Sequence, residues 1–213
     1  MPREALEWTD RGDGFNVVYG EGETPPLDRV NTLAAASHGG SVEEWCCKGS
    51  QRIVALKRME THGNKEDNEK LSYEVNILRQ VKHYHSVRIL GSYTHRDWFN
   101  IIMEPVALCD LRTYLMFDSS MKVRNMEHLC GPRMLFLPTI MGCLAHGLLY
   151  IHKETSVRHR DVKPANILLD GPRVLFADFG LSKTFTETHS GTSGPSDKTV
   201  MVKTAYSAKT EPR

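Results

Sequence analysis

One segment of this chain constrains its fold more than any other, because chemically active side chains stand on both sides of a short turn. The segment reads H-R-D-V-K-P-A-N at 159–166 and D-F-G at 178–180. Between these motifs, the apolar stretches 167–169 and 174–177 flank the turn-forming residues D-G-P-R at 170–173. This pattern predicts a β-hairpin that folds the segment back on itself.

The predicted hairpin brings four polar side chains into one small volume, namely Asp161, Lys163, Asn166 and Asp178. Asn166 and Asp178 offer oxygen ligands, which the hard ion Mg²⁺ prefers, often together with a polyphosphate. Asp161 adds a carboxylate base and Lys163 an ammonium group. A single loop aspartate is more often a turn former, and a single lysine is usually a solvated charge. Four such residues at this spacing indicate Mg²⁺-assisted phosphoryl transfer.

The same motifs resemble those of a known family. H-R-D-x-K-x-x-N followed by D-F-G is typical of the catalytic domain of eukaryotic-type protein kinases. Upstream, V-A-L-K at 54–57 resembles the V-A-I-K strand of that family, Glu74 resembles the glutamate of the helix that follows, and M-E-P-V at 103–106 resembles the hinge between the two lobes. All these motifs occur in family order. Lys163, two residues after Asp161, resembles the serine/threonine type.

The resemblance implies an α+β, bilobal protein kinase-like fold, with a strand-rich small lobe and an incomplete helical large lobe. We expect an irregular N-terminal extension over 1–32, with one short strand near 15–19. The small lobe and hinge are expected over 33–106. The partial large lobe, with the catalytic loop and the activation segment, is expected over 107–213.

Apolar periodicity predicts the main elements. Two hairpins are expected, one turning near 48–51 and one turning at 94–97, with a helix over 71–82 between them. Apolar spacing along 135–153 predicts a longer helix, and because proline is tolerated only in a first turn, Pro138 is expected to mark its start. Its apolar face consists of Leu137, Met141, Leu144, Leu148 and Ile151.

The resemblance also assigns the nucleotide site. Lys57 would contact the α- and β-phosphates of ATP and be held by Glu74 in an ion pair. Met103 would be the gatekeeper beside the adenine. The remaining residues expected around the nucleotide are Gly40, Val42, Ala55, Glu104, Val106 and Leu168.

The resemblance assigns the catalytic roles as well. Asp178 would bind one Mg²⁺ and Asn166 a second. Asp161 would orient the substrate hydroxyl and accept its proton, while Lys163 would steady the γ-phosphate. The implied partners are therefore ATP and a protein with a serine or threonine hydroxyl. Arg160 suggests control by an upstream activating kinase, because an activation-loop phosphate pairs well with arginine.

Two departures from the family pattern weigh on activity. The family's glycine-rich loop would place glycines at 35, 37 and 40, whereas this chain has Ala35, Ser37 and Gly40. Losing one or two phosphate hydrogen bonds there costs about 1–3 kcal/mol. In addition, the segment 204–211 only loosely resembles the end of the activation segment, and the chain stops soon after it. We therefore expect the isolated chain to be marginally stable, because an unburied face on the helix 135–153 forfeits up to roughly 8–15 kcal/mol.

These departures keep a second hypothesis open, a catalytically weak or inactive pseudokinase-like binding module. A small-molecule kinase is disfavoured because K-P-x-N is typical of protein kinases. With 27 Lys and Arg against 26 Asp and Glu, the net charge of +1 argues against a nucleic-acid partner. No apolar run approaches the ~20 residues that span a bilayer. With no export signal evident, we expect no membrane partner and a cytoplasmic or nuclear location.

Overall fold

The computed structural model describes residues 8–35, 40–61, 65–116 and 133–185. Within these residues, six strands form one sheet in the order β1-β5-β6-β4-β3-β2. Its strands are β1 (Val17–Tyr19), β2 (Leu27–Ala35), β3 (Ser41–Cys47), β4 (Ile53–Glu60), β5 (Arg88–His95) and β6 (Trp98–Glu104). β1 runs parallel to β5, and every other neighbouring pair in this sheet is antiparallel.

Both predicted small-lobe hairpins are confirmed, since β3 pairs with β4 and β5 pairs with β6. The prediction of an irregular extension over 1–32 is wrong for its last residues. Leu27–Ala35 is the edge strand β2, so the expected boundary after residue 32 falls inside a strand. Register shifts between Arg29 and Asn31 and between Thr32 and Ala34 break the in–out alternation that would have revealed this strand.

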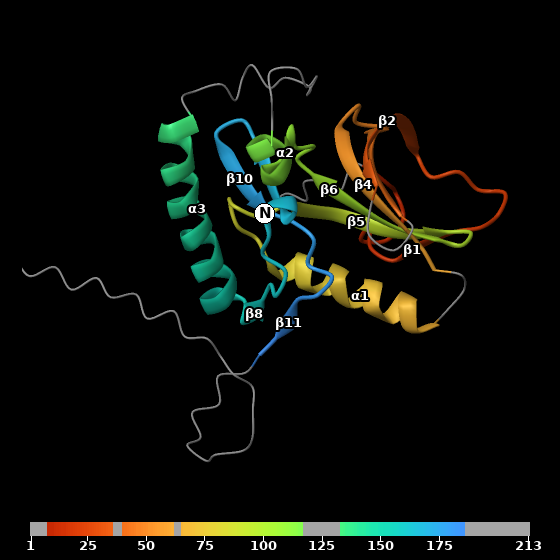
Figure 1. Ribbon diagram of the computed structural model, residues 1–213. Helices are drawn as coiled ribbons and strands as arrows, with labels where there is room; N and C mark the ends of the chain where they lie inside the picture. The colour runs from red at the N-terminus through yellow and green to blue at the C-terminus, as the bar shows by residue number, and fades with distance from the viewer. Residues whose placement is uncertain (1–7, 36–39, 62–64, 117–132, 186–213) are drawn as a thin grey trace, which may run out of the picture.

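The helix α1 (Lys65–Gln80) lies against the sheet (Figure 1). It begins before the predicted start at residue 71 and ends before Lys82, which is exposed. Val75, Ile77 and Leu78 are buried on its inner side together with the carboxylate-bearing Glu74. The apolar residues fix the helix to the sheet, and Glu74 is thereby held in the interior.

The described part of the large lobe combines helices with short strands. The helices are α2 (Leu111–Met116), α3 (Arg133–Glu154) and the single 3-10 turn η3 (Pro164–Asn166). The strands are β7 (Cys109–Asp110), β8 (Val157–Arg158), β9 (Ile167–Asp170), β10 (Arg173–Phe176) and β11 (Lys183–Thr184). β9 and β10 form the predicted hairpin, with Arg173 opposite Asp170. Gly171 at φ 59° makes the tight turn possible.

The long helix α3 differs from its prediction in start and in face. It begins at Arg133 rather than at Pro138, so the proline lies inside it. Ile140, Leu144 and Ile151 are buried, whereas Met141 is 63% exposed. The buried residues include Gly147, where an added Cβ would lie 2.9 Å from the ring of Phe176 on β10. The inner face is thus set by this close approach to β10.

This packing corrects, for Leu144 and Ile151, the expectation that the apolar face of the long helix stays unburied. Of the other three residues of that face, Met141 is exposed, Leu148 is half-buried, and the side chain of Leu137 lies outside what the structure describes. Leu144 is 7% exposed and Ile151 is fully buried within the described chain. Both belong to a core cluster that also contains Val75 and Leu78 of α1 and Phe176 of β10. One continuous core therefore joins the sheet, α1 and the β9–β10 hairpin.

Among the described residues, no helix has both the length and the apolar character needed to cross a membrane.

Candidate active site

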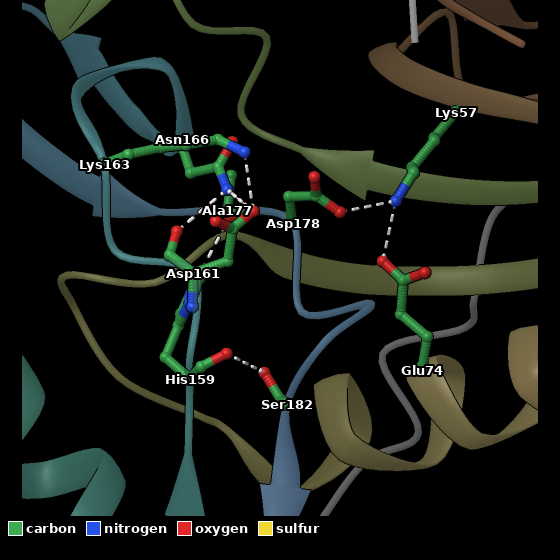
Figure 2. A network of polar contacts seen from close by, with 9 residues as sticks. All are labelled: Lys57, Glu74, His159, Asp161, Lys163, Asn166, Ala177, Asp178 and Ser182. Carbon is green, nitrogen blue, oxygen red and sulfur yellow. Dashed lines mark hydrogen bonds and ion pairs between the residues drawn. The ribbon is translucent and has the colours of Figure 1, made fainter. Parts of the chain in front are cut away.

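A buried lysine connects three elements at the centre of the site. Lys57 lies in the middle of β4, opposite Val42 on β3 and Ile101 on β6. Its Nζ donates to Glu74 Oε1 of α1 at 2.8 Å and to Asp178 Oδ1 at 2.9 Å. Figure 2 shows Lys57 between the two carboxylates, which approach it from different parts of the chain. The structure therefore brings together three residues that the sequence placed in separate motifs.

The charges of this network are stabilised by one another. Burial of Lys57 disfavours its charged form, but the carboxylates of Glu74 and Asp178 outweigh burial and raise the pKa of Lys57 above its ordinary value. Burial alone would raise the pKa of Asp178, yet the ammonium of Lys57 reverses this and lowers the pKa. Lys57 is consequently a fixed cation and Asp178 a fixed anion at neutral pH.

The other acidic centre is Asp161, in the loop before η3. Asn166 donates its Nδ2 to the backbone oxygen of Asp161 at 2.9 Å and to Asp161 Oδ2 at 2.8 Å. Lys163 donates to the same Oδ2 at 2.7 Å. The hydrogen bond from Lys163, assisted by the one from Asn166, lowers the pKa of Asp161. The aspartate is therefore ionised and oriented by two neighbours from its own loop.

A buried histidine joins the catalytic loop to the strand that precedes Asp178. His159 is 1% exposed, and its Nε2 lies 3.0 Å from the carbonyl oxygen of Ala177. Burial lowers the pKa of His159 below its ordinary value, so the ring is neutral. Because a carbonyl only accepts, Nε2 carries the proton, and Nδ1 accepts the N–H of Asp161 at 3.3 Å. One imidazole thus fixes both aspartate-bearing segments.

Two further contacts, each to a backbone oxygen, were not evident from the sequence. The Ser182 hydroxyl donates to the backbone oxygen of His159 at 3.0 Å, as Figure 2 shows. The N–H of Ala177 donates to the backbone oxygen of Asn166 at 3.0 Å. The sequence pointed to these contacts only through the predicted hairpin. A hairpin implies that the two ends of the segment meet, but it does not identify the atoms that form hydrogen bonds. The ring of Phe179 lies 4.6 Å from that of His159 and is fully buried.

The backbone is unusual where the two aspartates are presented. Arg160 has φ 67° and Asp178 has φ 59°, which is the left-handed region that L-residues seldom occupy. Such conformations cluster at functional sites, where the surroundings hold them. At Gly180 an added Cβ would lie 3.4 Å from Glu74 Oε2 and 3.5 Å from Asp178 Oδ1. A Cβ at position 180 would therefore make ordinary van der Waals contact with both carboxylates.

The residues expected around the adenine are distributed over both lobes. Ala55 on β4 pairs with Met103 on β6, and Ala55 is buried while Met103 is half-buried. The other residues expected around the nucleotide are all partly exposed, namely Gly40, Val42, Glu104, Val106 and Leu168. Glu104 forms ion pairs with Arg52 at 2.8 Å and with Arg88. Of the expected glycine-rich loop, residues 36–39 lie outside the described residues.

A cavity of about 650 Å³ lies beside the catalytic loop. Three of its lining residues are basic, namely Lys70 of α1, Arg160 and Lys183 of β11. Tyr73 of α1 also lines it, and the Tyr73 hydroxyl accepts the N–H of Thr184 at 3.1 Å. The resemblance makes hydroxyl residues from Thr184 to Thr199 candidates for phosphorylation, and all of these except Thr184 lie outside the described residues.

Comparison with known proteins agrees with this geometry. Receptor protein kinase WSS1 of Oryza sativa subsp. japonica is 34% identical over 168 residues, which cover 72% of this chain and 16% of that protein. Serine/threonine-protein kinase 1 of Arabidopsis thaliana is 29% identical over 174 residues, covering 80% of this chain and 19% of that protein. Serine/threonine-protein kinase fused of Drosophila melanogaster is 28% identical over 159 residues, covering 74% and 18%. The chain spans less than a fifth of each of these three relatives.

The sequence model of one family, described as the protein kinase domain, matches residues 37–209. That range includes every residue of the buried network and of the catalytic loop. The α+β kinase-like architecture, a strand-rich lobe with part of a helical one, agrees with the match. The chain therefore belongs to the protein kinase domain family.

Proposed function

We propose that this chain is a serine/threonine protein kinase domain that transfers the γ-phosphoryl group of ATP to a protein hydroxyl. One observation carries the proposal. Lys57 binds Glu74 and Asp178 at once, at 2.8 and 2.9 Å, from three separate elements. Protein kinases need this lysine–glutamate pair and this aspartate in place to hold a metal-bound triphosphate.

The residues present fit the nucleotide and its metal. Asp178 offers carboxylate oxygens, and Asn166, whose Nδ2 is engaged with Asp161, has its amide oxygen to offer. Hard Mg²⁺ binds such oxygen donors and phosphate together. When bound, the metal neutralises the charge that develops during transfer. Lys57 holds the α- and β-phosphates, and the slot between Ala55, Met103 and Leu168 accepts the adenine.

The catalytic loop supplies the groups that act on the substrate. Asp161 is ionised, so it accepts a hydrogen bond from the serine or threonine hydroxyl and then its proton. The ammonium of Lys163 contacts Asp161 and is half-exposed, so it is able to turn toward the γ-phosphate. The position of Lys163 two residues after Asp161 supports the choice of serine and threonine over tyrosine.

We infer that an upstream kinase regulates this activity. The cavity is lined by Lys70, Arg160 and Lys183, with which a phosphate pairs well, although Glu69 also lines it and Lys70 contacts Asp67 at 3.3 Å. A phosphate on a hydroxyl of the loop after Thr184 would bring two negative charges to this place. Such pairing would hold the activation segment against α1 and the catalytic loop.

One observation favours a second candidate, the catalytically weak or inactive pseudokinase-like binding module. Ala35 and Ser37 stand where the family uses glycines, and Ala35 is the last residue of β2. A Cβ at such positions hinders close approach of the backbone to phosphate. The module would retain nucleotide binding through Lys57 while transferring phosphate slowly.

Radiolabelled γ-phosphate transfer to a protein substrate separates the two candidates. We expect transfer by the unaltered chain and a loss of at least 100-fold for Asp161→Asn, which keeps the shape of the side chain and removes the base. Binding of Mg-ATP by calorimetry should be nearly unchanged in that variant. Transfer that survives Asp161→Asn contradicts the proposed mechanism, and nucleotide binding without any transfer favours the binding module.

A further inference from the structure

A segment before the matched kinase region is built into the small lobe. Residues 8–19, here called the N-terminal strap, precede residue 37, where the match to the kinase family begins. The strap contributes β1 to the edge of the sheet, where Val17 pairs with Tyr93 and Tyr19 with His95. Figure 1 shows β1 beside β5 at this edge, with α1 alongside.

The strap is seated by a close approach to Gly91 of β5. An added Cβ at Gly91 would lie 2.3 Å from both the backbone oxygen of Gly14 and Nε1 of Trp8. Trp8 is 3% exposed, and its ring lies 5.7 Å from that of Tyr93. The N–H of Ser92 donates to the same Gly14 oxygen at 3.0 Å. This seat requires glycine at position 91, since any side chain there would push the strap away from the sheet.

From this seat the strap reaches the last turn of α1. Asp13 Oδ2 accepts from Arg79 at 3.2 Å, and the guanidinium of Arg79 lies 4.1 Å from the centre of the Phe15 ring. Phe15 also packs against the core cluster that contains Val75 and Leu78 of the same helix. The strap therefore holds α1 by an ion pair, a cation–π contact and apolar packing.

Arg79 follows Glu74 by five residues, which is about 7.5 Å along a helix axis. The hydrogen bond between Lys57 and Glu74 is 2.8 Å long, and a shift of about 1 Å in α1 would break it. We propose that the strap positions Glu74 for Lys57 by clamping the last turn of α1, with Asp13, Phe15 and Arg79 as positioning residues and Gly91 as the seat. Its effect on catalysis rests on the proposed kinase function.

The test replaces the clamp residues in the full chain. Arg79→Met removes the charge and keeps the aliphatic stem, whereas Arg79→Lys keeps a cation for Asp13. The readout is the acetylation rate of Lys57, measured by mass spectrometry against the exposed Lys48 as internal reference. Without Glu74 in place, Lys57 loses its nearest anion and becomes more reactive. We expect about a three- to tenfold faster acetylation in Arg79→Met, with kcat falling by a similar factor and KM for the protein substrate unchanged.

Two further variants distinguish positioning from general destabilisation. Arg79→Lys should restore part of the wild-type acetylation rate. Combining Asp13→Asn with Arg79→Met should raise the acetylation rate of Lys57 no further than Arg79→Met alone, because both substitutions remove the same ion pair. If acetylation of Lys57 in Arg79→Met stays at the wild-type rate while the protein is folded, the proposal is overturned.

Gly91→Ala tests the seat, and Gly22→Ala is its matched control, since a Cβ at Gly22 meets nothing within 4 Å. We expect faster acetylation of Lys57 and faster tryptic cleavage after Arg11 in Gly91→Ala alone. Faster cleavage with unchanged acetylation would show a strap that does not position Glu74. If Gly91→Ala fails to fold, the variants at Arg79, whose side chain is half-exposed, still test the proposal. If the wild-type chain transfers no phosphate, the proposed kinase function is contradicted. The acetylation rates of Lys57 would still test whether the strap positions Glu74.

Discussion

Two ion pairs of nearly equal length lie in very different surroundings. Lys57 and Glu74 are 2.8 Å apart, with side chains 10% and 5% exposed. Lys163 and Asp161 are 2.7 Å apart, with side chains 52% and 22% exposed. Breaking a buried pair leaves an unpaired charge out of contact with water, whereas an exposed charge that loses its partner is solvated by water. The cost of breaking each contact therefore depends on its exposure to solvent and not on its length alone.

The difference suits the two proposed tasks. The pair on β4 and α1 must hold its geometry before a nucleotide arrives, so a contact that is costly to break is an advantage. The pair in the catalytic loop has to exchange partners when a hydroxyl and a phosphate arrive, so a weak contact is an advantage. Both features follow from where the main chain places the residues, at the centre of a sheet and in a surface loop.

The largest expected effect comes from breaking the buried pair. Glu74→Gln should lower the free energy of unfolding by about 3 kcal/mol, the lower end of the range for a buried charge that loses a partner, because Asp178 still contacts Lys57. Urea unfolding measures this loss. The matched control is Glu23→Gln at the exposed pair with Arg11, 2.7 Å long, where a much smaller loss is expected because water screens an exposed pair. Equal losses in the two variants would refute the comparison.

Acid should act on histidines rather than on the Lys57 network. The lowered pKa of Asp178 stabilises the fold above the ordinary aspartate pKa, and this is lost only as pH falls below about 4. The raised pKa of Lys57 stabilises below about pH 10 and is lost as pH rises further. Between these limits the contribution of the network to stability is constant.

Burial lowers the pKa of His83, His152 and His159, so the unfolded chain binds protons more readily than the folded chain. Stability should therefore fall as pH drops below about 6.5. Urea unfolding at several values between pH 7.5 and 5 measures the slope. His83→Asn should reduce this slope, because it removes one of the three rings whose pKa burial lowers. Glu74→Gln should leave the slope unchanged, and a changed slope would mean that the network titrates in this range.

The catalytic loop was predictable from sequence because its geometry is local. The turn at 170–173 pairs Arg173 with Asp170 and brings Asp178 back toward Asp161 within one supersecondary unit. The helix carrying Glu74 was predictable because its apolar spacing follows one helical face. Pairing of Lys57 with Glu74 followed from the family resemblance, since nothing in the spacing of the two residues fixes their distance.

What escaped prediction depends on irregular or long-range pairing. β2 escaped because two register shifts interrupt its alternation. β1 was expected as a short strand, but its parallel partner β5 lies 76 residues away and no local pattern identifies it. The inner face of α3 was misjudged because Gly147 carries no apolar side chain, yet the close approach to Phe176 makes it part of the contact. Helical periodicity counts apolar residues and misses a glycine that is buried for its small size.

The smallest effect on stability is expected at the exposed pair. Lys163→Ala should change the free energy of unfolding by less than about 1 kcal/mol, and raising the salt from 0.05 to 0.5 M should shrink even that difference. Phosphoryl transfer should nevertheless fall by about 10- to 100-fold, since the ammonium stabilises charge only while the γ-phosphate moves. Urea unfolding at both salt concentrations, with kcat measured alongside, checks the two halves of this prediction. A loss above about 2 kcal/mol that salt does not alter would place Lys163 with the buried network. The contrast between a fixed and an exchangeable ion pair would then have to be given up.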